Sequence, residues 1–146
     1  MKMKKLICVM ALVCTGILLV SCGSNRLGDP KAQLMRDFGL HIDKKDYVLE
    51  ALFNNYEGFA YEGIALYKLT VGEDVRQAFL QWERFPLPEA AENFLESLSA
   101  YVELPLIADG YWKMVDRTPG PSAYTNVSLC VFDRATGAAY LLTMDI

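Results

Sequence analysis

The stretch NVSLCVFD (Asn126–Asp133), followed by RATG (134–137) and AAYLLTMDI (138–146), decides the fold of this chain. Its apolar runs have the two-residue period of β-strands, and Gly137 can take the positive φ angle that closes a tight turn. The sequence therefore predicts a β-hairpin whose last strand is buried inside a sheet up to the final residue. The residues expected to face the core are Val127, Leu129 and Val131 on the first strand and Tyr140, Leu142, Met144 and Ile146 on the second.

Three further strands are predicted upstream of this hairpin. Residues 47–53 fit a helix as well as a strand, and the strand is preferred because residues 59–71 alternate while 54–58 (NNYEG) supply turn chemistry for a second hairpin. Residues 110–117 form the remaining strand, and 116–122, with its Pro-Gly-Pro run, is predicted to be a loop.

Helix signals lie between the predicted strands. Asp29-Pro30 is an acidic cap followed by proline at the first helical position, and that helix should end at Gly39. Residues 73–82 have a 3.6-residue period, and Pro88 can begin another helix that reaches Leu98. The sum predicts a single α+β domain over residues 30–146, an antiparallel sheet of about five strands with two or three helices packed on one face.

The first residues have the layout of a signal peptide. Lys2, Lys4 and Lys5 precede an uncharged run over 6–20, which is shorter than the roughly 20 apolar residues of a membrane span and is followed by polar residues. Leu19-Val20-Ser21-Cys22 resembles the lipobox of bacterial lipoproteins.

This resemblance implies that residues 1–21 are removed and that Cys22 becomes the acylated first residue, carrying palmitate-type chains. Residues 22–29 would then be a short tether between lipid and domain. The expected location is the outer face of the cytoplasmic membrane, or the outer membrane if the source has one. The expected partners are the membrane itself, through the Cys22 anchor, and an envelope protein or carbohydrate.

Removal of the leader leaves a strongly acidic domain. The leader takes three of the fourteen basic residues and none of the eighteen acidic ones, so the mature net charge is −7. Such a surface repels nucleic acid, which is excluded as a partner. The acidic residues are spread from Asp29 to Asp145, as expected of a solvated surface, although a patch for a basic partner is the alternative.

Cysteine usage leaves one thiol in the domain. Cys8 and Cys14 lie in the leader and Cys22 is expected to carry lipid, so Cys130 has no intrachain partner. Because it lies in an apolar strand, it is expected to be buried and unreactive.

The inventory of catalytic residues is small. His41 is the only histidine, and the sequence has no phosphate-binding loop and no zinc spacing, so neither a cofactor nor a metal is expected. Glu57 and Glu62 flank the predicted turn at 58–63, and Asp109 and Asp116 flank the aromatic pair Tyr111-Trp112. They are interpreted as exposed ion-pair partners, and a pair of them in a cleft could instead do acid and base chemistry.

Aromatic and acidic side chains beside the predicted turns are the candidate ligand-binding residues. An exposed ring there could stack on a sugar or anchor a protein partner. These candidates are Tyr56, Glu57, Phe59, Tyr61, Glu62, Tyr111 and Trp112.

Several segments together resemble a group of small uncharacterised bacterial proteins, many of which have lipoprotein leaders. The segments are Tyr56 to Gly63 (YEGFAYEG), Trp82 followed by Leu87-Pro88, Gly110-Tyr111-Trp112, Asp116-Arg117 and Phe132-Asp133. In that group the first segment has a His-Gly-Gly-Phe motif followed by Gly-Asp-Gly, whereas this chain has Glu57 near the histidine position and Glu62 at the aspartate position. The resemblance implies a fold and no activity.

Three classes of function remain open. The first is a membrane-anchored, non-catalytic binding or interaction domain, and the second is an immunity-like protein or inhibitor for a basic partner. The third is a small carboxylate-dependent hydrolase. A deep pocket with two close acids would favour the hydrolase, whereas an apolar surface would favour binding.

Overall fold

The structure is a computed structural model that describes residues 29–56, 62–121 and 123–146. The predicted leader, Cys22 and most of the tether therefore lie outside the described residues. So do three of the candidate ligand-binding residues, Glu57, Phe59 and Tyr61. Across the described residues, no helix combines the length and the apolar character needed to cross a membrane.

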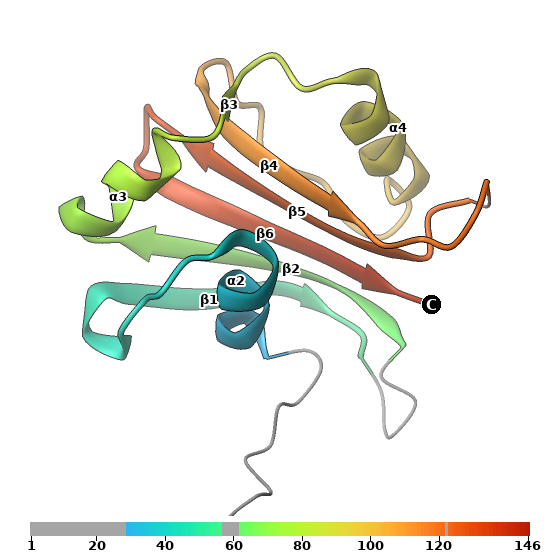
Figure 1. Ribbon diagram of the computed structural model, residues 1–146, viewed down its shortest axis with the longest axis horizontal. Helices are drawn as coiled ribbons and strands as arrows, with labels where there is room; N and C mark the ends of the chain where they lie inside the picture. The colour runs from blue at the N-terminus through green and yellow to red at the C-terminus, as the bar shows by residue number, and fades with distance from the viewer. Residues whose placement is uncertain (1–28, 57–61, 122) are drawn as a thin grey trace, which may run out of the picture.

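One antiparallel sheet organises the molecule (Figure 1). Its strands are β1 (Tyr47–Asn54), β2 (Gly63–Val71), β3 (Glu83–Arg84), β4 (Gly110–Asp116), β5 (Asn126–Asp133) and β6 (Ala138–Asp145). They lie in the order β1-β2-β6-β5-β4-β3. The described sheet has six strands rather than the five expected, because β3 is only two residues long and too short to show a period in the sequence.

The predicted hairpin forms the centre of this sheet. Leu129 pairs with Leu142, the turn closes through Gly137 at φ 69°, and β6 pairs with β2 on its other side. The prediction that the last strand is internal is therefore confirmed. It fails only at Ile146, which lies beyond the end of β6 and exposes 64 % of its surface.

Helices cover both faces of the sheet, so the expectation of one covered face is wrong. The first face packs against α2 (Pro30–Phe38) and α3 (Glu73–Phe79), and the second against α4 (Glu89–Ser97) (Figure 1). The reason lies in β5 and β6, which are buried at nearly every position, so apolar side chains point from them in both directions. The sequence prediction assigned only alternate residues of these strands to the core, which requires cover on one face only.

Each face carries its own hydrophobic cluster. On the first face Phe79 stacks on Phe132 with ring centroids 4.7 Å apart, and Phe38 contacts Trp82. On the second face the buried Phe94 of α4 meets Tyr124 edge to face at 5.5 Å. In the sheet that separates the two clusters, the paired strands are in regular register except at a bulge in β1 between Ala51 and Phe53.

Local signals set the helix ends as expected. The Asp29 side chain accepts a hydrogen bond from the Lys31 backbone N–H at 3.0 Å, Pro30 begins α2, and Gly39 ends it at φ 70°. Residues 47–54 form a strand, which confirms the strand that was preferred over a helix for residues 47–53.

Deletion of residues 140–146 should leave the domain unfolded or molten. It removes most of the strand that joins β2 to β5, and fully buried side chains such as Leu141 and Leu142 each contribute about 1.5 to 3 kcal/mol. That loss is comparable to the 5 to 15 kcal/mol stability of a typical domain. Near-ultraviolet circular dichroism and thermal melting test this expectation.

The matched control is Ile146→Ser, which changes an exposed side chain outside β6. It should shift stability by no more than about 0.5 kcal/mol. An unchanged melting curve after the deletion would show that β6 is dispensable.

Candidate functional site

The described candidate residues do not form one site. Tyr56 lies beside Gly63 at one end of the sheet, where Gly63 pairs with Asp145. Tyr111 lies near the other end, because it pairs with Phe132, which in turn pairs with Ala139. At about 3.4 Å per residue, these positions are separated by roughly 20 Å along the strands.

The four described candidates also differ in their environments. Tyr111 packs against the cluster of the first face and Trp112 against that of the second, as consecutive strand residues must. Glu62 is exposed just before β2. Tyr56 donates a hydrogen bond to Asp145 Oδ2 at 3.0 Å, and burial raises the pKa of its phenol. Three of these side chains therefore serve packing, and no two of the four line the same pocket among those formed by the described residues.

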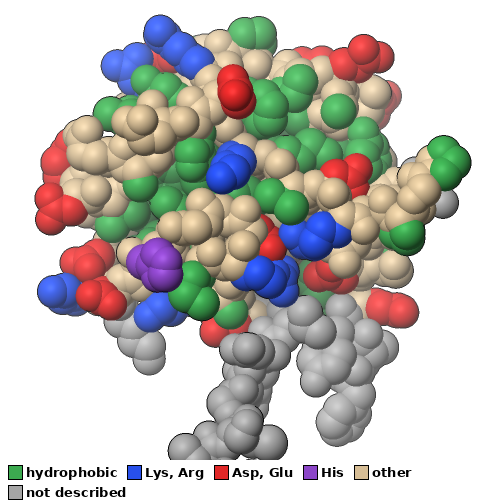
Figure 2. Space-filling model, viewed as in Figure 1, with side chains coloured by type: hydrophobic (Ala, Val, Ile, Leu, Met, Phe, Trp, Pro, Cys, Tyr) green, Lys and Arg blue, Asp and Glu red, His purple; other side chains and the backbone are tan. Residues whose placement is uncertain are grey.

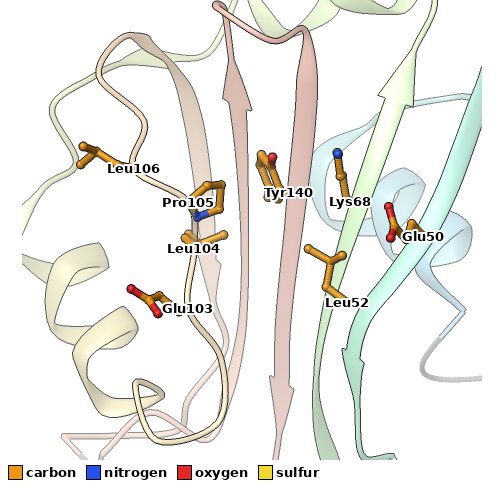
Figure 3. A pocket seen from close by; sticks show the side chains of 8 residues that line it. All are labelled: Glu50, Leu52, Lys68, Glu103, Leu104, Pro105, Leu106 and Tyr140. Atoms are coloured by element: carbon orange, nitrogen blue, oxygen red, sulfur yellow. The ribbon is translucent and has the colours of Figure 1, made fainter.

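A groove of about 430 Å³ on the second face is the better candidate site (Figure 3). One wall is the edge strand β1, with Glu50 and Leu52, and the other is the segment 103–106 that follows α4. Lys68 of β2 and Tyr140 of β6 form the floor between them, as Figure 3 shows.

Strand register explains why these side chains come together. Glu50 of β1 pairs with Lys68 of β2, and Lys68 pairs with Tyr140 of β6. Directly paired residues of antiparallel strands point to the same side of the sheet, with Cβ atoms about 5 Å apart. The three side chains therefore form a row across three neighbouring strands.

The groove exists because the cover on the second face is incomplete. Cluster residues of α4 and of the segment after it pack over β4, β5 and β6, while β1 keeps exposed apolar side chains on the same face. Val48 exposes 70 % of its surface, Leu52 45 %, and Leu106 on the opposite wall 99 %. Apolar side chains left in water on both walls are typical of a surface that binds something.

Charged groups sit among these apolar side chains. Glu50 and Glu103 are exposed on opposite walls, and Lys68 is half-buried on the floor. Among the described residues, none of the three takes part in an ion pair. A ligand could therefore meet either charge without first breaking a salt bridge.

Two other hollows offer less chemistry. A cavity of about 230 Å³ beneath residues 104–107 is lined by apolar side chains and adjoins the groove. A hollow of about 360 Å³ near Tyr101 and Ile146 has no charged side chain in its lining. Within the described ranges, no three His, Cys, Asp or Glu side chains are placed to hold a metal ion.

A separate polar network fastens α2 to the sheet. Asp37 is almost fully buried, with 2 % of its side chain exposed, and accepts hydrogen bonds from Arg36 at 2.7 Å and from Ser128 Oγ at 2.7 Å. Arg117 Nη1 lies 3.0 Å from the same carboxylate, and its Nε donates to Asn126 Oδ1 at 2.9 Å. These contacts join one helix to β5 and to the end of β4.

The electrostatics of Asp37 follow from these contacts. Burial by itself would raise the pKa of the carboxyl, but hydrogen bonds from Arg36 and Ser128 and the charge of Arg117 outweigh it and lower the pKa below its usual value. Nearby, the amide oxygen of the buried Gln33 has no hydrogen-bond partner among the described residues. The network joins α2 to β5 and lines none of the cavities described above.

Cys130 is fully buried in the cluster of the first face, as the sequence predicted. Burial raises the pKa of its thiol, so the thiolate that reagents require is disfavoured.

Surface charge on the α2 side is mixed. Figure 2 shows acidic and basic side chains interspersed over that face rather than gathered by sign. This agrees with the interpretation of the acidic residues as a solvated surface.

None of the groove residues is among the ligand-binding residues predicted from the sequence. Formation of the groove depends on the register of β1, β2 and β6 and on the path of residues 103–106, neither of which shows in a local pattern. Residues 47–52 are apolar at all positions but Glu50, which indicates a strand with apolar side chains on both faces but does not show which face is left uncovered.

Comparison of the chain with protein-family models, with curated proteins and with solved structures gave no match.

Asp37→Asn should lower the free energy of unfolding by about 1.5 to 3 kcal/mol at pH 7, because it removes the charge that three donors satisfy. The folded-state pKa is depressed, so the stabilisation by Asp37 is present above the unfolded carboxyl's pKa near 4 and is lost as the pH falls through the folded value. Urea unfolding of both proteins from pH 7 to pH 2 should show their difference shrinking below about pH 4.

Asp109→Asn is the matched control. Asp109 bridges Arg84 and Arg134 at the surface with 46 % of its side chain exposed, so its loss should cost less than about 1 kcal/mol. Equal losses for the two variants would contradict the structural role of the Asp37 network.

Proposed function

We propose that this protein is an exported lipoprotein, anchored through Cys22, whose domain is a non-catalytic binding domain. The anchor is supported by the sequence, in which three lysines, an uncharged run and Leu19-Val20-Ser21-Cys22 follow one another. Lipid chains stabilise membrane attachment by about 0.8 kcal/mol per buried methylene, so two or more chains hold a protein firmly.

The tether places the domain close to the membrane. Six residues lie between Cys22 and Asp29, the cap of α2, so seven Cα–Cα steps join the two. A fully extended chain of that length spans at most about 25 Å. A binding surface of the domain would therefore meet partners at the bilayer surface.

The groove is the observation that carries the binding function. Its volume falls within the range of about 300 to 1,000 Å³ that is common for ligand sites, and it combines apolar walls with a few polar groups that can orient a ligand. The two carboxylates on the walls outnumber the one lysine on the floor, and together with the acidity of the domain they favour a ligand with positive charge. This charge preference is shared with the alternative that the protein inhibits a basic partner.

Cys22→Ala should abolish fatty-acid labelling of the protein and leave an unprocessed precursor, because the sulfur of Cys22 is the expected acylation site. Metabolic labelling with a clickable palmitate analogue and gel mobility measure both effects. Cys130→Ala, which removes the buried thiol, is the control and should be labelled and processed normally. Normal maturation of the Cys22 variant would contradict the lipoprotein proposal.

A photo-reactive amino acid at position 106 should capture the binding partner on intact membranes, because Leu106 is the most exposed side chain of the groove wall. The same amino acid at position 35 is the control, since Met35 is half-exposed on α2, which packs on the other face. A discrete adduct is expected from position 106 alone. Adducts from position 35 alone, or from neither position, would exclude the groove as the binding site.

A further inference from the structure

The outer edge of β1 is unpaired in the described part of the chain. β1 ends the sheet, and no strand among the described residues pairs with its outer side. Edges of this kind are normally protected by lysines, other charges, proline, bulges or a covering segment. β1 contains neither lysine nor proline, its one charged residue is Glu50, and its pairing with β2 is regular from Tyr47 to Ala51, before the bulge at Leu52.

Side chains on the second face of β1 set a pattern for anything that pairs there. Val48 and Glu50 point to that face, as their pairing with Thr70 and Lys68 requires, and Leu52 lines the groove beside them. The pattern is therefore apolar, acidic, apolar along the strand. A complementary strand would present an apolar, basic, apolar pattern at alternate positions.

The groove beside β1 can accommodate the basic side chain of such a strand. Neighbouring strands lie about 4.8 Å apart, so a lysine or arginine side chain from an added strand is long enough to cross β1. It would reach Glu50 from the side opposite to Lys68 of β2, and the Glu50 carboxylate forms no ion pair among the described residues.

Charge argues against a second copy of this chain at the same edge. Glu50 lies at the middle of β1, so an antiparallel two-fold pairing of two β1 strands would bring the two Glu50 side chains opposite or next to each other. Like charges in such positions destabilise strand pairing.

We propose that β1 accepts an extended segment of a partner protein as a seventh strand, with a basic residue facing Glu50 between two apolar residues that pack on Val48 and Leu52. The proposal rests on the binding function proposed above and names its ligand class. Backbone hydrogen bonds to the open edge supply affinity, and the alternate side chains supply specificity.

Two synthetic peptides test this proposal with the full chain in detergent micelles. Each is a blocked heptapeptide with isoleucine at its second and sixth positions and threonine elsewhere, and the central residue is arginine in one and glutamate in the other. Amide NMR spectra of the ¹⁵N-labelled protein should show shifts concentrated in residues 47–54 and slower hydrogen exchange there. The arginine peptide should bind about fivefold or more tightly than the glutamate peptide.

Charge exchange makes the test specific. Glu50→Lys should reverse the preference between the peptides, and Glu50→Gln should abolish it without a new charge. Glu83→Lys, the same change on the edge strand β3 at the other end of the sheet, should leave it unaltered. The amide spectrum of each variant also shows whether it is folded.

Each remaining outcome would overturn strand addition. These outcomes are no shift in β1 with either peptide, equal binding of both peptides, and a concentration-dependent dimer that protects the β1 amides. The binding function is judged separately by the adduct at position 106, so an adduct without peptide binding would reject the strand and retain the groove.

Discussion

The pairing of β6 with both β2 and β5 is the constraint on which the rest of the structure depends. Without it, β1 and β2 would form one isolated hairpin, and β3, β4 and β5 would form another fragment with a bare edge. Because β6 is buried on both faces, it also requires helices on both sides of the sheet. A two-stranded hairpin alone is marginally stable in water, so β1 and β2 depend on β6 for their stability.

The helices cover the two faces of the sheet to different extents. On the first face α2 is held by hydrogen bonds and by Phe38, while α3 brings Phe79 onto Phe132. On the second face one helix and a loop cover β4 to β6, while Val48 and Leu52 of β1 stay exposed. The groove is the uncovered remainder of a sheet whose strands are apolar on both sides. A candidate binding site thus follows from the same property that builds the core.

Much of the fold could be predicted from the sequence because its signals are local. The turn at Gly137, the cap at Asp29 and the alternation in β5 and β6 each act over a few residues. The second helical layer could not be predicted from alternation alone, because an alternating pattern marks one apolar face and leaves the other undecided. The distance between Tyr56 and Tyr111 depends on strand order, which no local pattern records.

The strand order also ties folding to synthesis. A ribosome makes this chain from residue 1 onward, and the central strand comes after all five of its companions. β2 cannot form its pairing with β6 until β6 has been synthesised, because Gly63 at the start of β2 pairs with Asp145 near the end of the chain. Such distant pairings make folding slow. For the export proposed above, this delay would be useful, because a domain whose central strand is made last stays unfolded until that strand is available.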